Sequence, residues 1–345
     1  MIVTSLLLYN RQDWSKLMEE LAPSSIVILT DHNTELLCLP YFLSTYLEDV
    51  EFTHLSIEPG ESSKSTECAE EIWGVMLEEQ LDRKTLFVSL GGGVISDLGG
   101  FIASTYKRGI QSIHVPTTHL AMTDAAIGGK NGVNFHGLKN QIGSIRLPRA
   151  ILIDDQFLNT LPDREIRGGF IETIKHALIA DATFWKKIQT LEAKVAAKDK
   201  SIIKHSASIK QQIIEQDQDD FGIRQALNFG HTIGHALEAS LGISHGEAVA
   251  FGIIAESFIS EKQCGLPQEE LNEIIRLVKA CIIPDLPNNL NVDKLLTLMK
   301  SDKKNEYGEV RFSLISNIGI SKIGETVPIE IVEQSIAFAL SKMKG

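Results

Sequence analysis

The chain has 345 residues, a length that allows two domains with a large apolar core. Its formal net charge of -12 argues against a general nucleic-acid binder, although a local basic patch can still bind a small anion. The longest apolar runs are too short for a membrane span, and four widely spaced cysteines without a CxxC pair are typical of a reduced, cytoplasmic protein.

Short apolar runs alternate with polar helical stretches up to about residue 158. This alternation predicts an α/β domain with a mostly parallel, Rossmann-like sheet. An amphipathic crossover helix is expected over residues 65–80. Buried strands are expected at residues 2–8, 25–31, 85–93, 112–118 and 150–155.

Helical periodicity replaces the strand signals after about residue 160. A weak strand pair is expected late in the chain, around 310–315 and 320–323. Helices are expected at residues 166–180, 181–216, 226–241, 246–263 and 269–281. We therefore expect two domains, an α/β domain at 1–159 and a mostly α-helical C-terminal domain at 160–345.

Three consecutive glycines, Gly91–Gly93, stand between a buried strand and a helix. They let backbone approach a ligand closely, and the helix N-terminus offers unpaired N–H groups to a phosphate. The context suits a dinucleotide pyrophosphate, but GxGxxG is absent, so a plain strand-to-helix turn is the alternative. Asp31 and Asn33 lie where a ribose or nicotinamide could be contacted, and Glu61 and Lys64 form a second polar cluster.

The segment Leu227–His235 reads LNFGHTIGH and holds two histidines four residues apart. On a helix, His231 and His235 share one face, and Asn228 is expected to join it. With His245 and a carboxylate from elsewhere, these imidazoles could hold a catalytic zinc that keeps one coordination position open. Two ordinary core or surface histidines are the alternative.

Lysines next to glycines follow the predicted strand at 112–118. Lys130 and Lys139 suit the capture of a phosphate or another oxyanion, although simple exposure to solvent is the alternative for each. Farther along, Glu172 and Lys175 stand at positions i and i+3 of a predicted helix. A surface salt bridge is the plainer interpretation of that pair.

Taken together, these motifs resemble the 3-dehydroquinate synthases, a family of sugar phosphate cyclases. Five segments carry the resemblance in family order and cover both expected domains. They are residues 91–110, 115–144, 168–181, 227–239 and 245–252.

The resemblance implies conversion of 3-deoxy-D-arabino-heptulosonate 7-phosphate (DAHP) to 3-dehydroquinate and phosphate. It implies transient oxidation by NAD, phosphate elimination, reduction and aldol closure, with Zn²⁺ or Co²⁺ as the metal. It also implies a homodimer. The implied metal ligands are Glu172, His231 and His245, which leaves His235 on the substrate side, in conflict with the spacing argument above.

The resemblance also assigns the remaining site residues. The implied catalytic residues are Asp124, Lys130, Asn140, Lys175 and His235. The implied substrate-binding residues are Arg108, Lys139, Lys210, Arg224, Asn228 and either Lys303 or Lys304, with Lys304 favoured. The implied NAD contacts are Asp31, Asn33, Glu61, Lys64, Gly92, Gly93, Val94, Asp97, Thr117, Thr118, Lys130, Lys139, Phe157 and Thr160.

The sequence departs from the family pattern at Ser96, at Ala125–Ala126 and at His176, positions that bear on fine specificity. None of these departures removes a charged catalytic group. The alternatives to a dehydroquinate synthase are a cyclase for another sugar phosphate and a metal-dependent polyol dehydrogenase. The dehydroquinate synthase is favoured by the retention of Lys130, Lys139, Asn140, Asn228 and His235.

Overall fold

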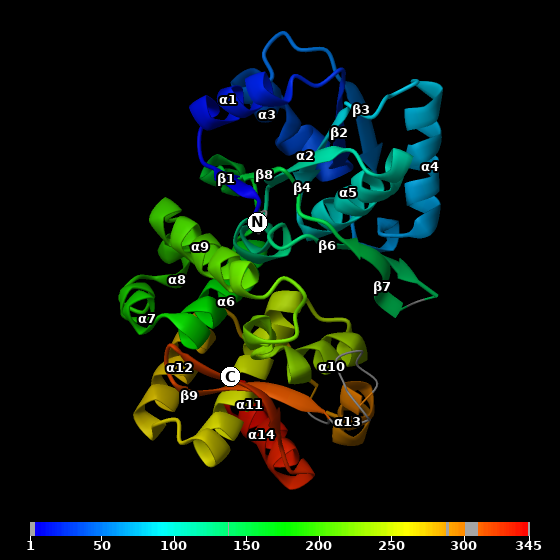
Figure 1. Cartoon of the computed structure of the whole chain (residues 1–345). Helices are drawn as coiled ribbons and strands as arrows, with labels where there is room; N and C mark the ends of the chain where they lie inside the picture. The colour runs from blue at the N-terminus through cyan, green and yellow to red at the C-terminus, as the bar shows by residue number, and fades with distance from the viewer. Residues whose placement is uncertain (1–3, 137, 288–289, 301–309, 344–345) are drawn as a thin grey trace. The chain divides into compact units, whose positions relative to one another are not determined.

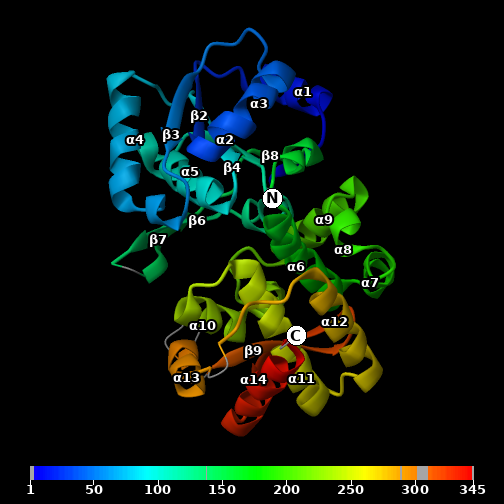
Figure 2. The same ribbon diagram turned by 180° about the vertical axis from the view of Figure 1, so that it is seen from behind.

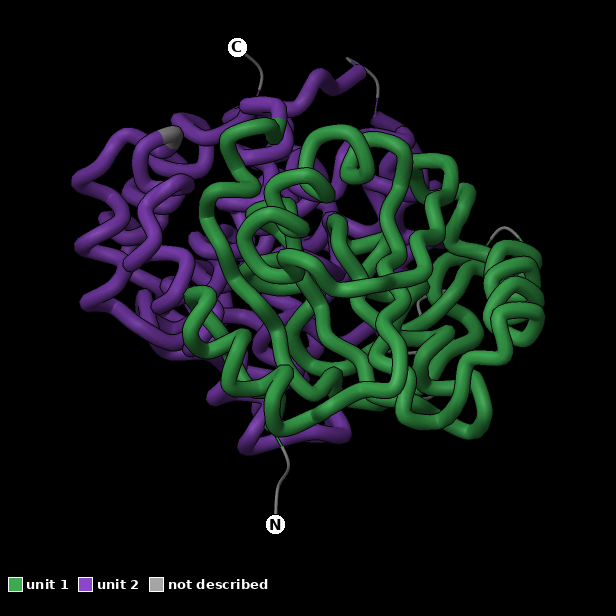
Figure 3. Tube along the Cα trace, turned by 90° about the horizontal axis from the view of Figure 1, so that it is seen from above, with its two compact units in different colours: residues 1–161 green, residues 162–345 purple. Residues whose placement is uncertain are grey.

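The computed structural model describes residues 4–136, 138–287, 290–300 and 310–343. The chain forms two compact units, Met1–Leu161 and Pro162–Gly345 (Figure 3). Among the described helices, none combines the length and the apolar character that crossing a membrane requires.

Unit 1 is built on a six-stranded sheet in which every neighbouring pair is parallel, as predicted (Figure 1). The strand order is β1-β8-β5-β4-β2-β3. Their bounds are Leu6–Leu8 (β1), Ile26–Asp31 (β2), Thr53–Ile57 (β3), Leu86–Gly91 (β4), Gln111–Pro116 (β5) and Ala150–Leu152 (β8). The edge strand β3 was not predicted, because it is only partly buried and lacks the continuous apolar run of a central strand.

The helices of unit 1 pack against this sheet and form its core. Figures 1 and 2 show α4 beside α5, and buried Phe87, Met76 and Ile102 belong to the apolar cluster between them and the sheet. Elsewhere Trp14 packs edge to face on Phe42, with ring centroids 5.4 Å apart. The helix bounds are Arg11–Leu21 (α1), His32–Leu37 (α2), Leu39–Tyr46 (α3), Thr66–Glu78 (α4) and Gly93–Thr105 (α5).

An antiparallel hairpin of β6 (Lys130–Phe135) and β7 (Leu138–Ile145) occupies the segment with the paired lysines and glycines. These strands were not predicted, because β7 is almost fully exposed and has no buried face to impose an alternating pattern. The two strands approach closely at a glycine: a Cβ on Gly143 would lie 2.1 Å from the carbonyl oxygen of Asn131. The close approach of the two strands therefore depends on Gly143, which contributes no side chain to an alternating pattern.

Unit 2 is mostly helical and carries one antiparallel strand pair, as predicted. The strands are β9 (Arg311–Asn317) and β10 (Ile320–Thr326). The helices are Asp163–Ala180 (α6), Ala182–Ile188 (α7), Ala193–Ala196 (α8), Lys200–Gln216 (α9), His231–Leu241 (α10), His245–Cys264 (α11), Gln268–Cys281 (α12), Val292–Lys300 (α13) and Ile329–Met343 (α14).

The single helix predicted over 181–216 is wrong, because the chain forms three helices there. Asp181 accepts hydrogen bonds from the backbone N–H groups of Thr183 and Phe184 and so begins α7. Asp199 begins α9 in the same way. An aspartate stabilises a helix as its N-cap and competes with helix formation inside it, so these two residues divide the segment.

The helix predicted over 226–241 is also wrong at its start. Residues Ile223–Asn228 form a short 3₁₀ helix, and α10 begins only at His231. Gly230 separates the two with a φ of +80°, a left-handed conformation that an α-helix cannot contain. Asn228 therefore does not share a helix face with His231 and His235.

Candidate active site

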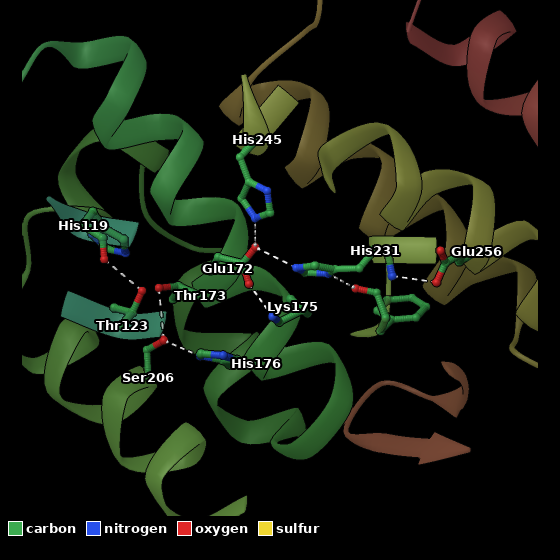
Figure 4. Close-up of polar contacts among 12 residues, drawn as sticks. His119, Thr123, Glu172, Thr173, Lys175, His176, Ser206, His231, His245 and Glu256 are labelled. Atoms are coloured by element: carbon green, nitrogen blue, oxygen red, sulfur yellow. Dashed lines mark hydrogen bonds and ion pairs between the residues drawn. The ribbon is translucent and has the colours of Figure 1, made fainter. Parts of the chain in front are cut away.

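Three side chains from three helices of unit 2 converge on one point. Glu172 comes from α6, His231 from the first turn of α10 and His245 from the first turn of α11 (Figure 4). One donor atom from each lies within 4.8 Å of the other two. Nε2 of His231 and Nε2 of His245 both face Oε1 of Glu172, at 3.6 and 3.3 Å.

The other ring nitrogen of each histidine is anchored in the protein. Nδ1 of His231 lies 3.2 Å from the carbonyl oxygen of Phe229, and Nδ1 of His245 lies 3.0 Å from Oε2 of Glu238. Each anchor fixes the ring and leaves Nε2 free to point at the shared centre. Two imidazoles and one carboxylate are a donor set of catalytic zinc sites, so these residues fit a divalent metal with an open position.

Sequence reasoning missed the anchor Glu238. Its position was a usable signal, because it stands seven residues after His231 and hence on the same helix face. A search for a carboxylate at that spacing would have found it. A carboxylate behind a ligating histidine also raises the basicity of the ring.

Lys175 forms an ion pair with Glu172 inside the unit (Figure 4). Both side chains are 1% exposed, so the surface salt bridge considered from sequence is excluded. The lysine brings a buried positive charge to the carboxylate that faces both histidines. Breaking such a pair on one side leaves an uncompensated buried charge.

The two histidines differ in their affinity for a proton in the metal-free protein. Burial and then the charge of Lys175 hold the pKa of His231 well below its usual range. Burial alone would lower the pKa of His245 as well, but hydrogen bonds to Glu172 and Glu238 raise it to about 9. Without metal, these opposite pKa shifts favour a neutral His231 and a protonated His245 at neutral pH.

His235 lies one turn after His231 on α10, beside the donor group. Its ring centroid is 5.0 Å from that of His231 and 6.0 Å from that of His245. Among the described residues, the donor group that contains His231 includes Glu172 and His245 and does not include His235. Helix α10 thus places His231 in the donor group and His235 beside it.

The implied substrate residues of unit 2 come from several elements. Lys210 is on α9 and buried, and Arg224 and Asn228 are on the 3₁₀ helix. The Arg224 guanidinium donates to the carbonyl oxygen of Gln218 at 2.7 Å, which fixes its direction. Lys303 and Lys304 lie outside the described residues. His176, a departure from the family pattern, is fully buried with Nδ1 2.9 Å from the Ser206 hydroxyl.

In unit 1 the glycine turn lies where the strand order changes direction. From β4 the chain goes to β5 on one side, and from β2 it goes to β3 on the other. Ligands of open α/β sheets bind at the carboxyl ends of strands at such a point. Asp31 ends β2, Gly92 and Gly93 follow β4, and Thr117 and Thr118 follow β5, so three groups of implied NAD contacts share this edge.

The N-terminus of α5 is suited to a phosphate. Its N-cap Gly92 has extended backbone, and no side chain caps the helix or adds an acidic charge to its first turn. A Cβ on Gly92 would lie 3.1 Å from Cγ2 of Thr118, a tight contact that the Thr118 side chain would have to relieve by a small shift. Gly93, Val94 and buried Ser96 continue the first turns of this helix.

Lys64 stands at the centre of a polar network in unit 1. Its side chain is 4% exposed and forms an ion pair with Asp97, and its Nζ donates to Oδ1 of Asn140 at 2.5 Å. Asn140 in turn donates its backbone N–H to Asn134, whose side-chain nitrogen donates to Oε1 of Glu61 at 2.9 Å. A cavity of about 430 Å³ adjoins the network, lined by Glu61, Ser62, Lys64, Ser65, Glu67, Asn134, Phe135, His136 and Lys139.

The other implied residues of unit 1 lie on helix ends and turns. Asp31 caps α2, and Asn33 is exposed in its first turn. Phe157 is buried against Tyr41, with ring centroids 5.3 Å apart, and exposed Thr160 follows it. Asp124 and Ala125 are on a short π-helical turn at Ala121–Ala125, and Ala126 follows it. Arg108 is exposed with a φ of +66°. Lys130 is the first residue of β6 and Lys139 the second of β7, and both are exposed.

Glycine contacts hold the three metal-donor helices close together. A Cβ on Gly246 of α11 would lie 2.5 Å from the carbonyl oxygen of Gly168 on α6. A Cβ on Gly252 of α11 would lie 1.8 Å from the carbonyl oxygen of Gly230, directly before α10. Both close approaches are possible only without a side chain.

Solved synthases that close sugar phosphates and solved glycerol and alcohol dehydrogenases are similar to this chain in fold. The 2-epi-5-epi-valiolone synthase of Streptomyces hygroscopicus, solved with NAD⁺ and Zn²⁺ bound, is similar in fold with a TM-score of 0.86 and 24% identity, covering 99% of this chain and 98% of that one. An iron-containing alcohol dehydrogenase of Thermococcus thioreducens has a TM-score of 0.71 at 16% identity, covering all of both chains.

Sequence comparison separates these possibilities. Family profiles described as 3-dehydroquinate synthase N-terminal and 3-dehydroquinate synthase C-terminal match residues 54–168 and 169–305. A 3-dehydroquinate synthase of Parabacteroides distasonis is 38% identical over 332 residues, which are 93% of this chain and 93% of the relative. One of Rippkaea orientalis is 40% identical over 84% of this chain and 82% of the relative. The chain belongs to the 3-dehydroquinate synthase family, which confirms the resemblance.

Proposed function

We propose that this protein converts DAHP to 3-dehydroquinate and inorganic phosphate, with NAD reduced and reoxidised within each turnover. The observation that carries the proposal is the convergence of Glu172, His231 and His245, in a chain whose two halves match the two halves of the family. Elimination of phosphate needs a carbonyl next to the carbon that loses its proton, and the transient oxidation supplies it.

Glu172, His231 and His245 would hold Zn²⁺ or Co²⁺, consistent with the Zn²⁺ and the Co²⁺ bound in two structurally similar cyclases. When bound, the metal polarises the hydroxyl that is oxidised. Lys175 balances the charge of Glu172 and adds a buried cation next to this proposed ligand. His235, whose ring lies next to those of His231 and His245, would exchange a proton with the substrate hydroxyl through a ring nitrogen.

The glycine turn and its neighbours would hold NAD at the carboxyl edge of the sheet. The free N–H groups of the first turn of α5 would receive the pyrophosphate. Asp31 would accept a hydrogen bond from a ribose hydroxyl, and the amide of Asn33 would donate one to the ribose. The rest of the set in unit 1 is Glu61, Lys64, Gly92, Gly93, Val94, Asp97, Thr117, Thr118, Lys130, Lys139, Phe157 and Thr160.

The cationic and amide side chains would bind the anionic ends of the substrate. DAHP carries a carboxylate and a phosphate, and both prefer charge-assisted hydrogen bonds. Arg224 is already oriented by Gln218. The proposed substrate set is Arg108, Asp124, Lys130, Lys139, Asn140, Lys175, Lys210, Arg224, Asn228, His235 and Lys304 or Lys303.

A phosphate-release assay tests the proposal. Purified protein should release phosphate from DAHP only when both NAD and a divalent metal are present, and NADH should not accumulate. Absence of release under those conditions would contradict the proposal. Faster turnover of sedoheptulose 7-phosphate would identify another cyclase, and steady NADH accumulation with a polyol would identify a dehydrogenase.

We further propose that the active form is a cytoplasmic homodimer with no membrane or nucleic-acid partner. The family assignment and the net charge of -12 support this. Light scattering of the purified protein should give twice the chain mass of 38.1 kDa. A monomer at assay concentration with full activity would contradict the dimer.

A further inference from the structure

The first turn of α10 carries His231 but lacks a cap of its own. An α-helix begins with N–H groups that have no partner within it, and a side chain at the N-cap position usually satisfies one of them. Here the N-cap is Gly230, which has no side chain, and no side-chain cap bond is formed from that position. The residue three positions later is Ile233, which is fully buried and cannot return a hydrogen bond to the N-cap.

Glu256 of α11 supplies both missing bonds. Its Oε2 accepts the N–H of Gly230 at 2.6 Å, and its Oε1 accepts the N–H of Ile233 at 3.1 Å. These are the two donors that a capping box satisfies within one helix, the N-cap and the third residue. The carboxylate is fully buried, and it lies at the positive end of the α10 dipole.

A cap within α10 is prevented by the packing of this junction. Gly230 has a φ of +80°, and its carbonyl oxygen occupies the space where a Cβ on Gly252 would lie. Serine or aspartate at position 230 would therefore be strained in backbone conformation. The carboxylate has to come from the neighbouring helix, and α11 presents it one turn beyond Gly252.

The helix that provides this cap also provides a metal donor. His245 and Glu256 are both on α11, eleven residues apart and so on nearly the same face. His231 stands between the two N–H groups that Glu256 accepts. We propose that Glu256 is a positioning residue that caps α10 from α11 and thereby fixes His231 against Glu172 and His245 before any metal binds. This inference rests on the metal site of the proposed function.

Zinc affinity of Glu256→Gln tests this role. The amide keeps the shape of the side chain but replaces one acceptor oxygen with an NH₂ group, so one backbone N–H loses its partner. We expect the zinc affinity, measured by competition with a chromophoric chelator, to fall about 10- to 100-fold, the range for residues that support a metal ligand. No catalytic assay is needed.

Asp181→Ala is the matched control. It removes a carboxylate that also caps two N–H groups, at the start of α7, a helix that carries none of the proposed site residues. Both variants should have a lower Tm, and only Glu256→Gln should lose zinc affinity. Unchanged zinc affinity in folded Glu256→Gln, or an equal loss in Asp181→Ala, would overturn the positioning role. A wild-type protein that binds no zinc would overturn the metal site itself.

Amide hydrogen exchange of the wild-type protein provides a second test if Glu256→Gln does not fold. The metal-free protein should protect the N–H groups of Gly230 and Ile233, because the cap forms without metal. Addition of zinc should change their exchange little. Fast exchange of both amides in the metal-free protein, with protection only after zinc is added, would overturn the proposal.

Discussion

Each unit contains a buried lysine paired with a carboxylate, and the two pairs are built in different ways. In unit 2, Lys175 and Glu172 are three residues apart on α6. In unit 1, Lys64 follows a 3₁₀ turn, Asp97 is on α5 and Asn140 is on the exposed strand β7. The first pair follows from helix periodicity, whereas the second exists only after three distant elements have assembled. Sequence spacing can therefore find the first and not the second.

The largest expected effect is the loss of metal binding when a proposed ligand in unit 2 is removed. His231→Ala should remove stoichiometric zinc binding and lower the rate of phosphate release by at least about 10³-fold, because a metal supplies several kcal/mol of charge stabilisation. NAD affinity, measured by fluorescence titration, should change little because the glycine turn is in unit 1. His235→Ala is the control, and it should keep the zinc while losing rate. Unchanged zinc content in His231→Ala would refute the ligand assignment.

Removing the lysine of unit 2 should have the next largest effect. Lys175→Met takes a cation away from the buried Glu172 carboxylate, which keeps its contact with His245, so the unfolding free energy of the metal-free protein should fall by about 3 kcal/mol. Urea unfolding in the presence of EDTA measures this. Zinc should restore part of the loss, because the metal becomes the partner of Glu172. A loss that zinc does not reduce would show that the pair acts independently of the metal.

Acid should weaken unit 1 through a different buried group, His114 of β5. Burial lowers the pKa of this imidazole from 6.5 to about 4. Its stabilising contribution is complete above pH 6.5, the pKa of the unfolded chain, and is lost as the pH falls through 4. The total is about 3 kcal/mol. Urea unfolding of His114→Gln should show a flatter decline of stability between these pH values, and an unchanged slope would contradict this origin.

Removing the lysine of unit 1 should have the smallest effect. Lys64→Met should lower the unfolding free energy by about 2 kcal/mol, the value of a hydrogen bond to a charged group. The loss is smaller than for Lys175 because the Asp97 side chain is 21% exposed and water can solvate it. The same urea experiment, with Lys175→Met alongside, ranks the two pairs. Equal losses would remove the distinction between them.

The sequence was informative wherever a buried face imposes a repeat. The central strands β2, β4 and β5 were predicted because both faces are buried and the apolar run is continuous. The hairpin was not predicted, because β7 is exposed on both faces. The predicted start of α10 at residue 226 was too early, because helical periodicity takes no account of the left-handed conformation of Gly230.

The residues of the candidate site also divide into those that sequence spacing reveals and those that it does not. Glu172 and Lys175 were selected together because a helix repeat links them, although their burial was not foreseen. Glu238 had a helical spacing that could have revealed it. Glu256 could not be found, because its partners are backbone N–H groups that have no sequence signature.

The glycines between the metal-donor helices have a consequence for evolution. Gly230, Gly246 and Gly252 contribute no atom to the metal, yet a methyl group at any of them would displace a helix that carries a ligand. Natural variation at these positions should therefore be as restricted as at the ligands themselves. An alignment of metal-binding relatives would show invariant positions with no chemistry of their own, and relatives that have lost the metal should be the first to accept alanine there.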